Sequence, residues 1–157
     1  MSNYIVVLTV IPLKAKRQKG SFDLFDEISK IFSNNKIVLK NGDVIVISSK
    51  YVANSQGRIL DTNSIFASKD AESISKKFKI KPKFAEVILR ESDKIFGGVS
   101  GFVITSSDNI LAPNSGIDKS NSDGTRLVLY PDDPYLVAEN LKRKIFVRDS
   151  IHVGIII

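Results

Sequence analysis

The stretch NGDVIVISSK, residues 41–50, is the part of the sequence that decides the fold. Its first three residues are a turn signal, and the β-branched run Val44 to Ile47 after them predicts a short strand buried on both faces. Ser48, Ser49 and Lys50 follow, and the carboxyl end of a strand is where α/β sheets commonly bind ligands. The alternative is that these three residues are only a polar exit from the strand.

The segments on either side of this stretch alternate between strand-like and helix-like patterns. A β-branched run predicts a strand over 3–10 that Pro12 ends, and apolar residues at helical spacing predict a helix over 23–32. The remaining patterns predict a helical hairpin that starts at Ser68, a β-hairpin over 101–112, a strand over 127–129, a helix over 134–144 and a strand over 151–157. Residues 1–157 are therefore expected to form one α+β domain, with mixed β-sheets flanked by helices.

Individual residues mark where several helices begin. Ser68 and Asp133 are the expected N-caps of two helices, because their side-chain oxygens accept hydrogen bonds from the first turn. Pro82 is expected at the start of the second helix of the helical hairpin. The apolar side of that helix is expected to extend from Phe84 to Phe96.

The apolar run over 151–157 predicts a buried strand with no turn or polar tail after it. Chain termini usually lie at exposed, polar sites. We therefore expect the sequence to be the amino-terminal portion of a longer protein. The alternative is an edge strand whose end reaches solvent.

Composition limits the possible chemistry. The 157 residues contain no cysteine and a single histidine, His152, which excludes disulfides, thiolate metal sites and His-rich zinc centres. Any metal is therefore expected to be held by oxygen. The sequence has neither the pattern of a signal peptide nor an apolar run of the roughly 20 residues that a membrane helix requires, so we expect a cytoplasmic protein.

The net charge of +6 makes anionic partners plausible. Basic residues cluster at 14–19, 76–83 and 142–144, and the last two clusters are expected to be solvated faces. For the cluster at 14–19, a solvated face and a binding role are both open. No zinc-finger, RNP or GXXG pattern is present, so a nucleic-acid-binding module is the least favoured class.

The loop NSGIDKSN, residues 114–121, gathers groups suited to phosphate and metal between two apolar runs. Gly116 allows close backbone approach to a ligand, Asp118 offers a carboxylate to a hard divalent cation, and Asn121 offers an amide. The alternative is that Asp118 and Asn121 only close an Asx turn.

The order of these motifs resembles the coenzyme F420-0:L-glutamate ligase family, also called F420-0:gamma-glutamyl ligases. The resemblance spans nearly all of the chain, through the turn and strand at 41–47, SSKYVANSQGR at 48–58, ILRES at 88–92, NSGIDKSN at 114–121 and PDDP at 131–134. It implies a gamma-glutamyl-ligase-like domain over 1–157, an intertwined homodimer and a cytoplasmic enzyme of coenzyme F420 biosynthesis. The implied reaction uses GTP to add L-glutamate to the lactyl carboxylate of the deazaflavin precursor F420-0 through an acyl phosphate.

The resemblance also implies roles for particular residues. Asp118 corresponds to a carboxylate that binds Mg²⁺ or Mn²⁺. The implied nucleotide contacts are Ile11, Pro12, Leu13, Lys14, Ser49, Lys50 and Asn121. Because phosphoryl transfer depends mainly on positioning and charge neutralisation, such a site needs neither histidine nor cysteine.

The chain departs from the family pattern in two places. Asn54 stands where the family usually has a lysine, so one positive contact to the nucleotide is absent or supplied from elsewhere. The family's second metal-binding segment, an Asp-Thr pair, would lie just beyond Ile157. The alternative function is therefore a non-catalytic ligase-like domain that binds a nucleotide, an anionic metabolite or a partner chain.

Overall fold

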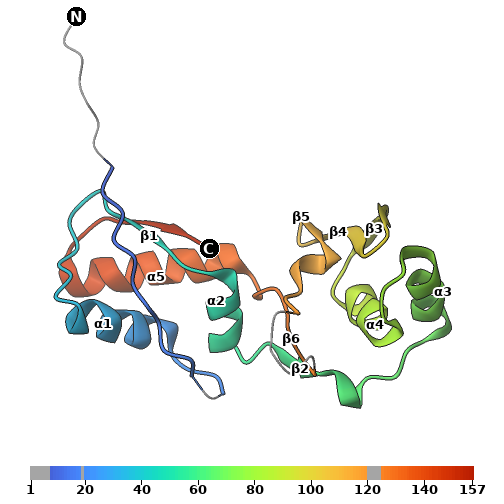
Figure 1. The fold of residues 1–157 in the computed structure, drawn as a ribbon. Helices are drawn as coiled ribbons and strands as arrows, with labels where there is room; N and C mark the ends of the chain where they lie inside the picture. The colour runs from blue at the N-terminus through green and yellow to red at the C-terminus, as the bar shows by residue number, and fades with distance from the viewer. Residues whose placement is uncertain (1–7, 19, 120–124) are drawn as a thin grey trace, which may run out of the picture.

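The computed structural model describes residues 8–18, 20–119 and 125–157, and it places them in two lobes side by side (Figure 1). The first lobe contains α1, α2, α5, β1 and β7. The second contains α3, α4 and the three strands β3 to β5. The expected α+β class is confirmed, but the sheets that the described residues form are not mixed, because one is parallel and the other two are antiparallel.

The first lobe is a two-stranded parallel sheet packed on helices. β1 (Val44–Val46) pairs with β7 (Gly154–Ile156), although the two strands are far apart in the chain. The helices of this lobe are α1 (Leu24–Asn34), α2 (Ser49–Ser55) and α5 (Pro134–Asp149). Its core is formed by buried apolar side chains from all three helices and from the end of β1, namely Leu24, Ile28, Ile47, Val52 and Leu141.

Local sequence explains where the helices of this lobe start. The Asp23 side chain accepts a hydrogen bond from the backbone N–H of Asp26 and so caps α1. Asp133 caps α5 in the same way through the N–H of Leu136, as expected, with Pro134 in the first turn. α5 extends to Asp149, five residues beyond the expected end at Lys144, because Ser150 in the left-handed conformation ends it.

The prediction that the strands over 44–47 and 151–157 are buried on both faces is wrong. Ile45 and Ile155 face the helices, whereas Val44 is 58% exposed, Val46 71% and Ile156 54%. A run of apolar residues cannot distinguish one covered face from two, because every position in it is apolar. The β1–β7 sheet therefore has an apolar face that no described residue covers.

The second lobe packs a helical hairpin against a three-stranded antiparallel sheet. α3 (Lys69–Phe78) and α4 (Pro82–Arg90) form the hairpin, and the sheet has the order β3 (Lys94–Val99), β4 (Phe102–Ser107), β5 (Ile110–Pro113). Asp108 and Asn109 both adopt positive φ in the β4–β5 turn, as a tight hairpin turn requires. The expected helical hairpin and β-hairpin are confirmed.

One boundary in this lobe was predicted wrongly. α4 ends at Arg90, and Phe96 lies in β3 with 55% of its surface exposed, not on the buried side of the helix. The apolar residues of β3 continue the helical spacing of α4, so the pattern did not show where the helix ends and the strand begins. The core of this lobe is formed by Ala71, Phe78, Phe84, Val87, Ile88 and Val103 with their neighbours.

Two short antiparallel strands join the lobes, β2 (Ile59–Asp61) and β6 (Arg126–Val128). Short 3-10 turns follow β2 at Thr62–Ser64 and β5 at Asn114–Gly116. Beyond the second turn, Asp118 forms an isolated antiparallel bridge with Val128. The loop 114–119 is thereby fixed beside the junction of the lobes.

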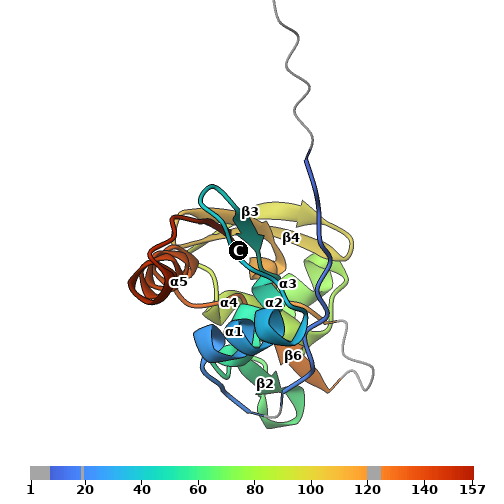
Figure 2. The ribbon, with the colours of Figure 1, turned by 90° about the vertical axis from the view of Figure 1, so that its left-hand side faces the viewer.

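Residues 8–18 run along the first lobe without regular secondary structure. A strand was expected over 3–10, but residues 8–10 are not in a strand. Leu8 is 84% exposed and Val10 is 77% exposed. The rest of that predicted strand lies outside the described residues. Figure 2 shows this segment and α5 on opposite sides of β1. Among the described residues, no helix has the length and apolar character needed to cross a membrane.

Candidate functional site

A groove of about 1580 Å³ lies between the segment 8–18 and the first lobe. Its floor includes β1 and the apolar side of α1, and its far end reaches α2, Ile59 of β2 and Val128 of β6. The volume exceeds the roughly 300–1,000 Å³ of ordinary small-molecule pockets. The uncovered side chains of β1, Val44 and Val46, therefore line a wide groove.

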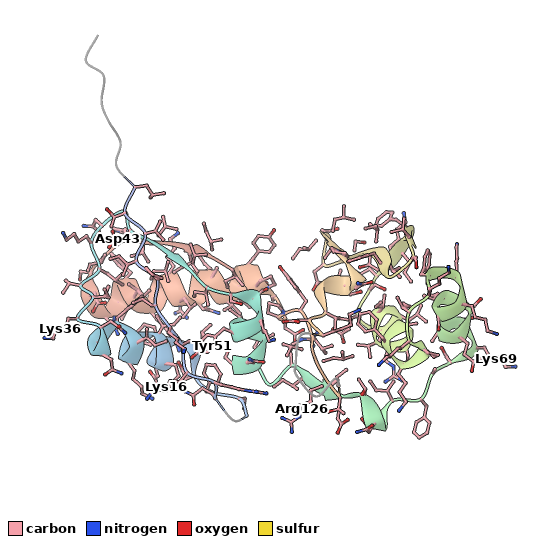
Figure 3. The ribbon with its side chains drawn as sticks, in the orientation of Figure 1. Lys16, Lys36, Asp43, Tyr51, Lys69 and Arg126 are labelled. Atoms are coloured by element: carbon pink, nitrogen blue, oxygen red, sulfur yellow. The ribbon has the colours of Figure 1, made fainter. Side chains whose placement is uncertain are left out.

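The polar lining of the groove is strongly basic. Its charged side chains, among the described residues, are Lys14, Lys16, Arg17, Lys50 and Arg126, against the single carboxylate of Asp43. Figure 3 shows Lys16 and Asp43 on the first lobe and Arg126 near the junction of the lobes. Such a lining attracts anions, and low-dielectric apolar walls strengthen the attraction. The described basic residues of the cluster at 14–19 thus line this groove, and a binding role for them stays a prediction.

The fold brings together two residues that the sequence singled out separately, and one of them, Lys50, lines the groove. The Nζ atom of Lys50, in the first turn of α2, lies 2.9 Å from Oδ2 of Asp118. Both side chains are about one-third exposed. The backbone of Asp118 is held by two hydrogen bonds to Val128, of 2.8 and 3.0 Å, so the carboxylate projects from a fixed strand-like position.

The residues that precede Asp118 in the loop have structural partners. The Asn114 side chain accepts a hydrogen bond from the Val103 N–H, and the Ser115 N–H donates to Oγ1 of Thr105. Gly116 has φ +66°, and a Cβ atom there would lie 2.6 Å from the Tyr130 ring. Gly116 is thus needed for its conformation and for its packing on Tyr130, whereas the sequence had suggested approach to a ligand.

The other predicted site residues are divided between the groove and its surroundings. Ile11, Leu13 and Lys14 line the groove, and Pro12 is exposed within the same segment. Ser49 is the first residue of α2, next to Lys50. The predicted contact at Asn121 lies outside the described residues.

No cluster of three or more histidine, aspartate or glutamate side chains suited to a metal ion occurs in the described part of the chain. Asp118 therefore offers one carboxylate. That is compatible with Mg²⁺, which is commonly held by one or two carboxylates together with phosphate oxygens and water. It would not suffice for a metal held by protein side chains alone.

Sequence reasoning missed the helix α2 and Tyr51, and it noted Asn54 only as a departure from the family pattern. Tyr51 and Asn54 both line the groove with Lys50. The spacing of three and four residues between these positions is typical of one face of a helix and was the available signal. The basic clusters at 76–83 and 142–144 are exposed on α3, α4 and α5, as expected of solvated faces.

Comparison with known proteins identifies the family of this chain. The family model described as F420-0:Gamma-glutamyl ligase matches residues 13–157. A coenzyme F420:L-glutamate ligase of Methanopyrus kandleri is 28% identical over 148 residues, which are 94% of this chain and 56% of that protein. Proteins of the same name from Methanocaldococcus jannaschii and Methanococcus maripaludis strain S2 are 32% and 34% identical over 121 residues, which are 76% of this chain and 48% of each protein.

The chain thus spans about half the length of the curated relatives it matches. The family match covers most of the chain and includes both Lys50 and Asp118. The resemblance seen in the sequence motifs is confirmed, and this chain belongs to the F420-0:gamma-glutamyl ligase family.

Proposed function

We propose that this protein is a GTP-dependent ligase that adds L-glutamate to the lactyl carboxylate of the deazaflavin F420-0. The observation that carries the proposal is the Lys50–Asp118 pair, 2.9 Å apart, beside a groove with a basic lining. The relatives of known name, which are coenzyme F420:L-glutamate ligases, support the choice of substrates.

In this proposal the groove binds the nucleotide. Lys14 and Lys50 pair with the triphosphate, and the backbone of the segment Ile11 to Lys14 contributes further hydrogen bonds. The groove is larger than a nucleotide needs, so its apolar part beside Val44 and Val46 has room for a second substrate. Both substrates would then meet near α2.

Asp118 would supply one ligand to a Mg²⁺ or Mn²⁺ ion, whose other ligands would be phosphate oxygens and water. When bound, such an ion neutralises charge on the phosphate oxygens. The ammonium group of Lys50, which pairs with Asp118 in the structure, would remain within reach of the same oxygens. Both roles depend on position and charge, and neither needs a proton-transferring side chain.

The reaction proposed has two steps. An oxygen of the lactyl carboxylate attacks the γ-phosphorus of GTP, the bond to the β-phosphate oxygen breaks, and GDP leaves with an acyl phosphate formed. The amine of glutamate then attacks the acyl carbon, phosphate leaves with the bonding electrons, and the amine loses a proton. Lys14, Lys50 and Arg126 would hold the anionic groups in place during both steps.

The test is ligation by the complete product of the coding region. The protein is incubated with GTP, Mg²⁺ or Mn²⁺, L-glutamate and F420-0, and glutamate incorporation is followed by mass spectrometry. We expect a product heavier by one glutamate residue, dependent on both GTP and the ion. Failure of the intact protein to form it under all these conditions would rule out the enzyme.

The alternative function is a domain that binds a nucleotide, an anionic metabolite or a partner chain without catalysis. It is favoured by Asn54 in the place of the family's usual lysine. In that case GTP binding would be saturable but no glutamate would be incorporated.

We also propose a homodimer. Five large apolar side chains of the second lobe's sheet are exposed, namely Phe96, Val99, Phe102, Ile104 and Leu111, and extended apolar surface of this kind marks interaction sites. Sedimentation equilibrium should give twice the mass of the chain.

A further inference from the structure

Two buried polar atoms of α2 have no hydrogen-bond partner in the described part of the chain. They are the hydroxyl oxygen of Tyr51 and the side-chain carbonyl oxygen of Asn54. Buried polar groups in folded proteins nearly always have a partner, and an unsatisfied one costs free energy. Two such atoms on a single short helix therefore call for an explanation.

The position of Tyr51 and Asn54 explains why these atoms have no partner among the described residues. Tyr51 and Asn54 are three residues apart on α2 and line the same groove as Lys50, which is four residues before Asn54. Residues at these spacings lie on one face of a helix. The two atoms are thus screened from bulk water by the protein while their side chains border the space that a ligand would fill.

The surroundings of Tyr51 keep its hydroxyl neutral. Burial raises the pKa of Tyr51, and the nearby negative charge of Glu27 raises it further. The ring packs against Phe22, with 5.1 Å between the ring centroids, and Figure 3 shows Tyr51 beside α1 on the first lobe. The hydroxyl is therefore held in one place as a group that can both donate and accept a hydrogen bond.

We propose that Tyr51 and Asn54 together bind a neutral hydrogen-bond donor of the ligand, either the 2′-hydroxyl of the ribose or the 2-amino group of the guanine base. This inference rests on the proposed nucleotide site in the groove. The carbonyl oxygen of Asn54 can only accept a hydrogen bond. Fully ionised phosphate groups also only accept, so the triphosphate cannot be its partner.

The basic residues and the Tyr51–Asn54 pair have different roles in the groove. Lys14, Lys50 and Arg126 attract anions of any kind, whereas Tyr51 and Asn54 select what the anion is attached to. A site built to hydrogen-bond a ligand group discriminates against the analogue that lacks the group, because its own polar atoms then stay unpaired.

Calorimetric binding measurements on the complete product of the coding region test the inference. The variants are Tyr51→Phe and Asn54→Leu. Their matched controls are Tyr135→Phe on α5 and Asn34→Leu at the end of α1, which change exposed residues away from the groove. The ligands are GTP, 2′-deoxy-GTP, inosine triphosphate and inorganic triphosphate, each with Mg²⁺.

We expect each variant to weaken GTP binding about three- to tenfold, the effect of one lost hydrogen bond, and to leave inorganic triphosphate binding unchanged. The analogue that lacks the bound donor should bind wild-type protein as weakly as the variants bind GTP. A loss with 2′-deoxy-GTP identifies the ribose, and a loss with inosine triphosphate identifies the base. The free Tyr51→Phe protein should melt at the wild-type temperature or above it, because no described residue hydrogen-bonds to the Tyr51 hydroxyl.

Two results would overturn this inference without affecting the proposed nucleotide site. One is GTP binding that both variants leave at the wild-type affinity. The other is an equal loss for GTP and inorganic triphosphate together with a lower melting temperature, which would show a structural role. If the wild-type protein bound inorganic triphosphate but not GTP, both this inference and the proposal that the groove binds GTP would be wrong.

Discussion

At the scale of single residues, the pair of Asp118 and Lys50 is central to the proposed chemistry. The two side chains lie 2.9 Å apart, yet both are about one-third exposed. An ion pair with that exposure contributes at most about 1 kcal/mol to the free energy of unfolding. Loss of the pair should therefore affect binding much more than folding.

Asp118→Asn is the corresponding experiment. We expect Mg²⁺-dependent GTP binding to weaken at least about tenfold, equivalent to about 1.4 kcal/mol, because the amide carries no charge for the ion. The melting temperature should stay nearly unchanged. Asp70→Asn on the exposed side of α3 is the control and should alter neither quantity. Unfolding of Asp118→Asn with normal binding would show that the residue is only part of a turn.

At the scale of elements, Glu86 joins the two helices of the hairpin. One carboxylate oxygen accepts a hydrogen bond of 2.9 Å from the Ser68 N–H at the start of α3, and the other accepts one of 2.9 Å from Arg90 on its own helix. The hydrogen bonds from Ser68, followed by the interaction with Arg90, lower the pKa of Glu86 to about 2. The charged form therefore stabilises the hairpin.

This arrangement predicts how stability depends on pH. Because the pKa of Glu86 is lower in the folded protein than in the unfolded chain, its contribution is complete above about pH 4.5 and is lost as the pH falls toward about 2. Glu86→Gln should lower the free energy of unfolding by roughly 1–2 kcal/mol at pH 7.

Urea denaturation at a series of pH values measures the effect. The difference between wild type and Glu86→Gln should shrink from pH 4.5 downward. Glu72→Gln, an exposed change on α3, is the control. A difference that stayed constant from pH 7 to 2 would show that the charge of Glu86 is irrelevant.

At the scale of the whole molecule, Arg58 connects the two lobes. Its guanidinium group pairs with Glu91 at the end of α4 and with Asp132 before α5, at 3.0 Å from the latter, and it donates to the Tyr130 carbonyl at 2.8 Å. Arg58 and Glu91 are both mostly buried. The site loop lies at the same junction, since Gly116 packs on Tyr130.

Arg58→Met should lower the free energy of unfolding by roughly 1–3 kcal/mol, because Glu91 would stay partly buried without its partner. It should also weaken GTP binding, since Lys50 and Asp118 come from opposite sides of the junction. Arg143→Met on the exposed side of α5 serves as the control. Wild-type stability in Arg58→Met would mean that other contacts hold the lobes together.

Features that depend only on neighbouring residues could be predicted from the sequence. Several signals act within a few residues of the chain: capping by Ser68 and Asp133, the proline that starts α4, and the turn at Asp108. The sequence therefore predicted the positions of these helices and of the β4–β5 hairpin closely. The family motifs likewise pointed to Asp118 and Lys50 as separate candidates.

Only the tertiary structure decided which distant segments meet. It paired β1 with β7, left Val44 and Val46 uncovered beside the segment 8–18, and brought Lys50 to Asp118. The physical reason is that strand pairing and burial are set by contacts between residues remote in the chain. A run of apolar side chains gives the same sequence pattern whether one face of the strand is buried or both are.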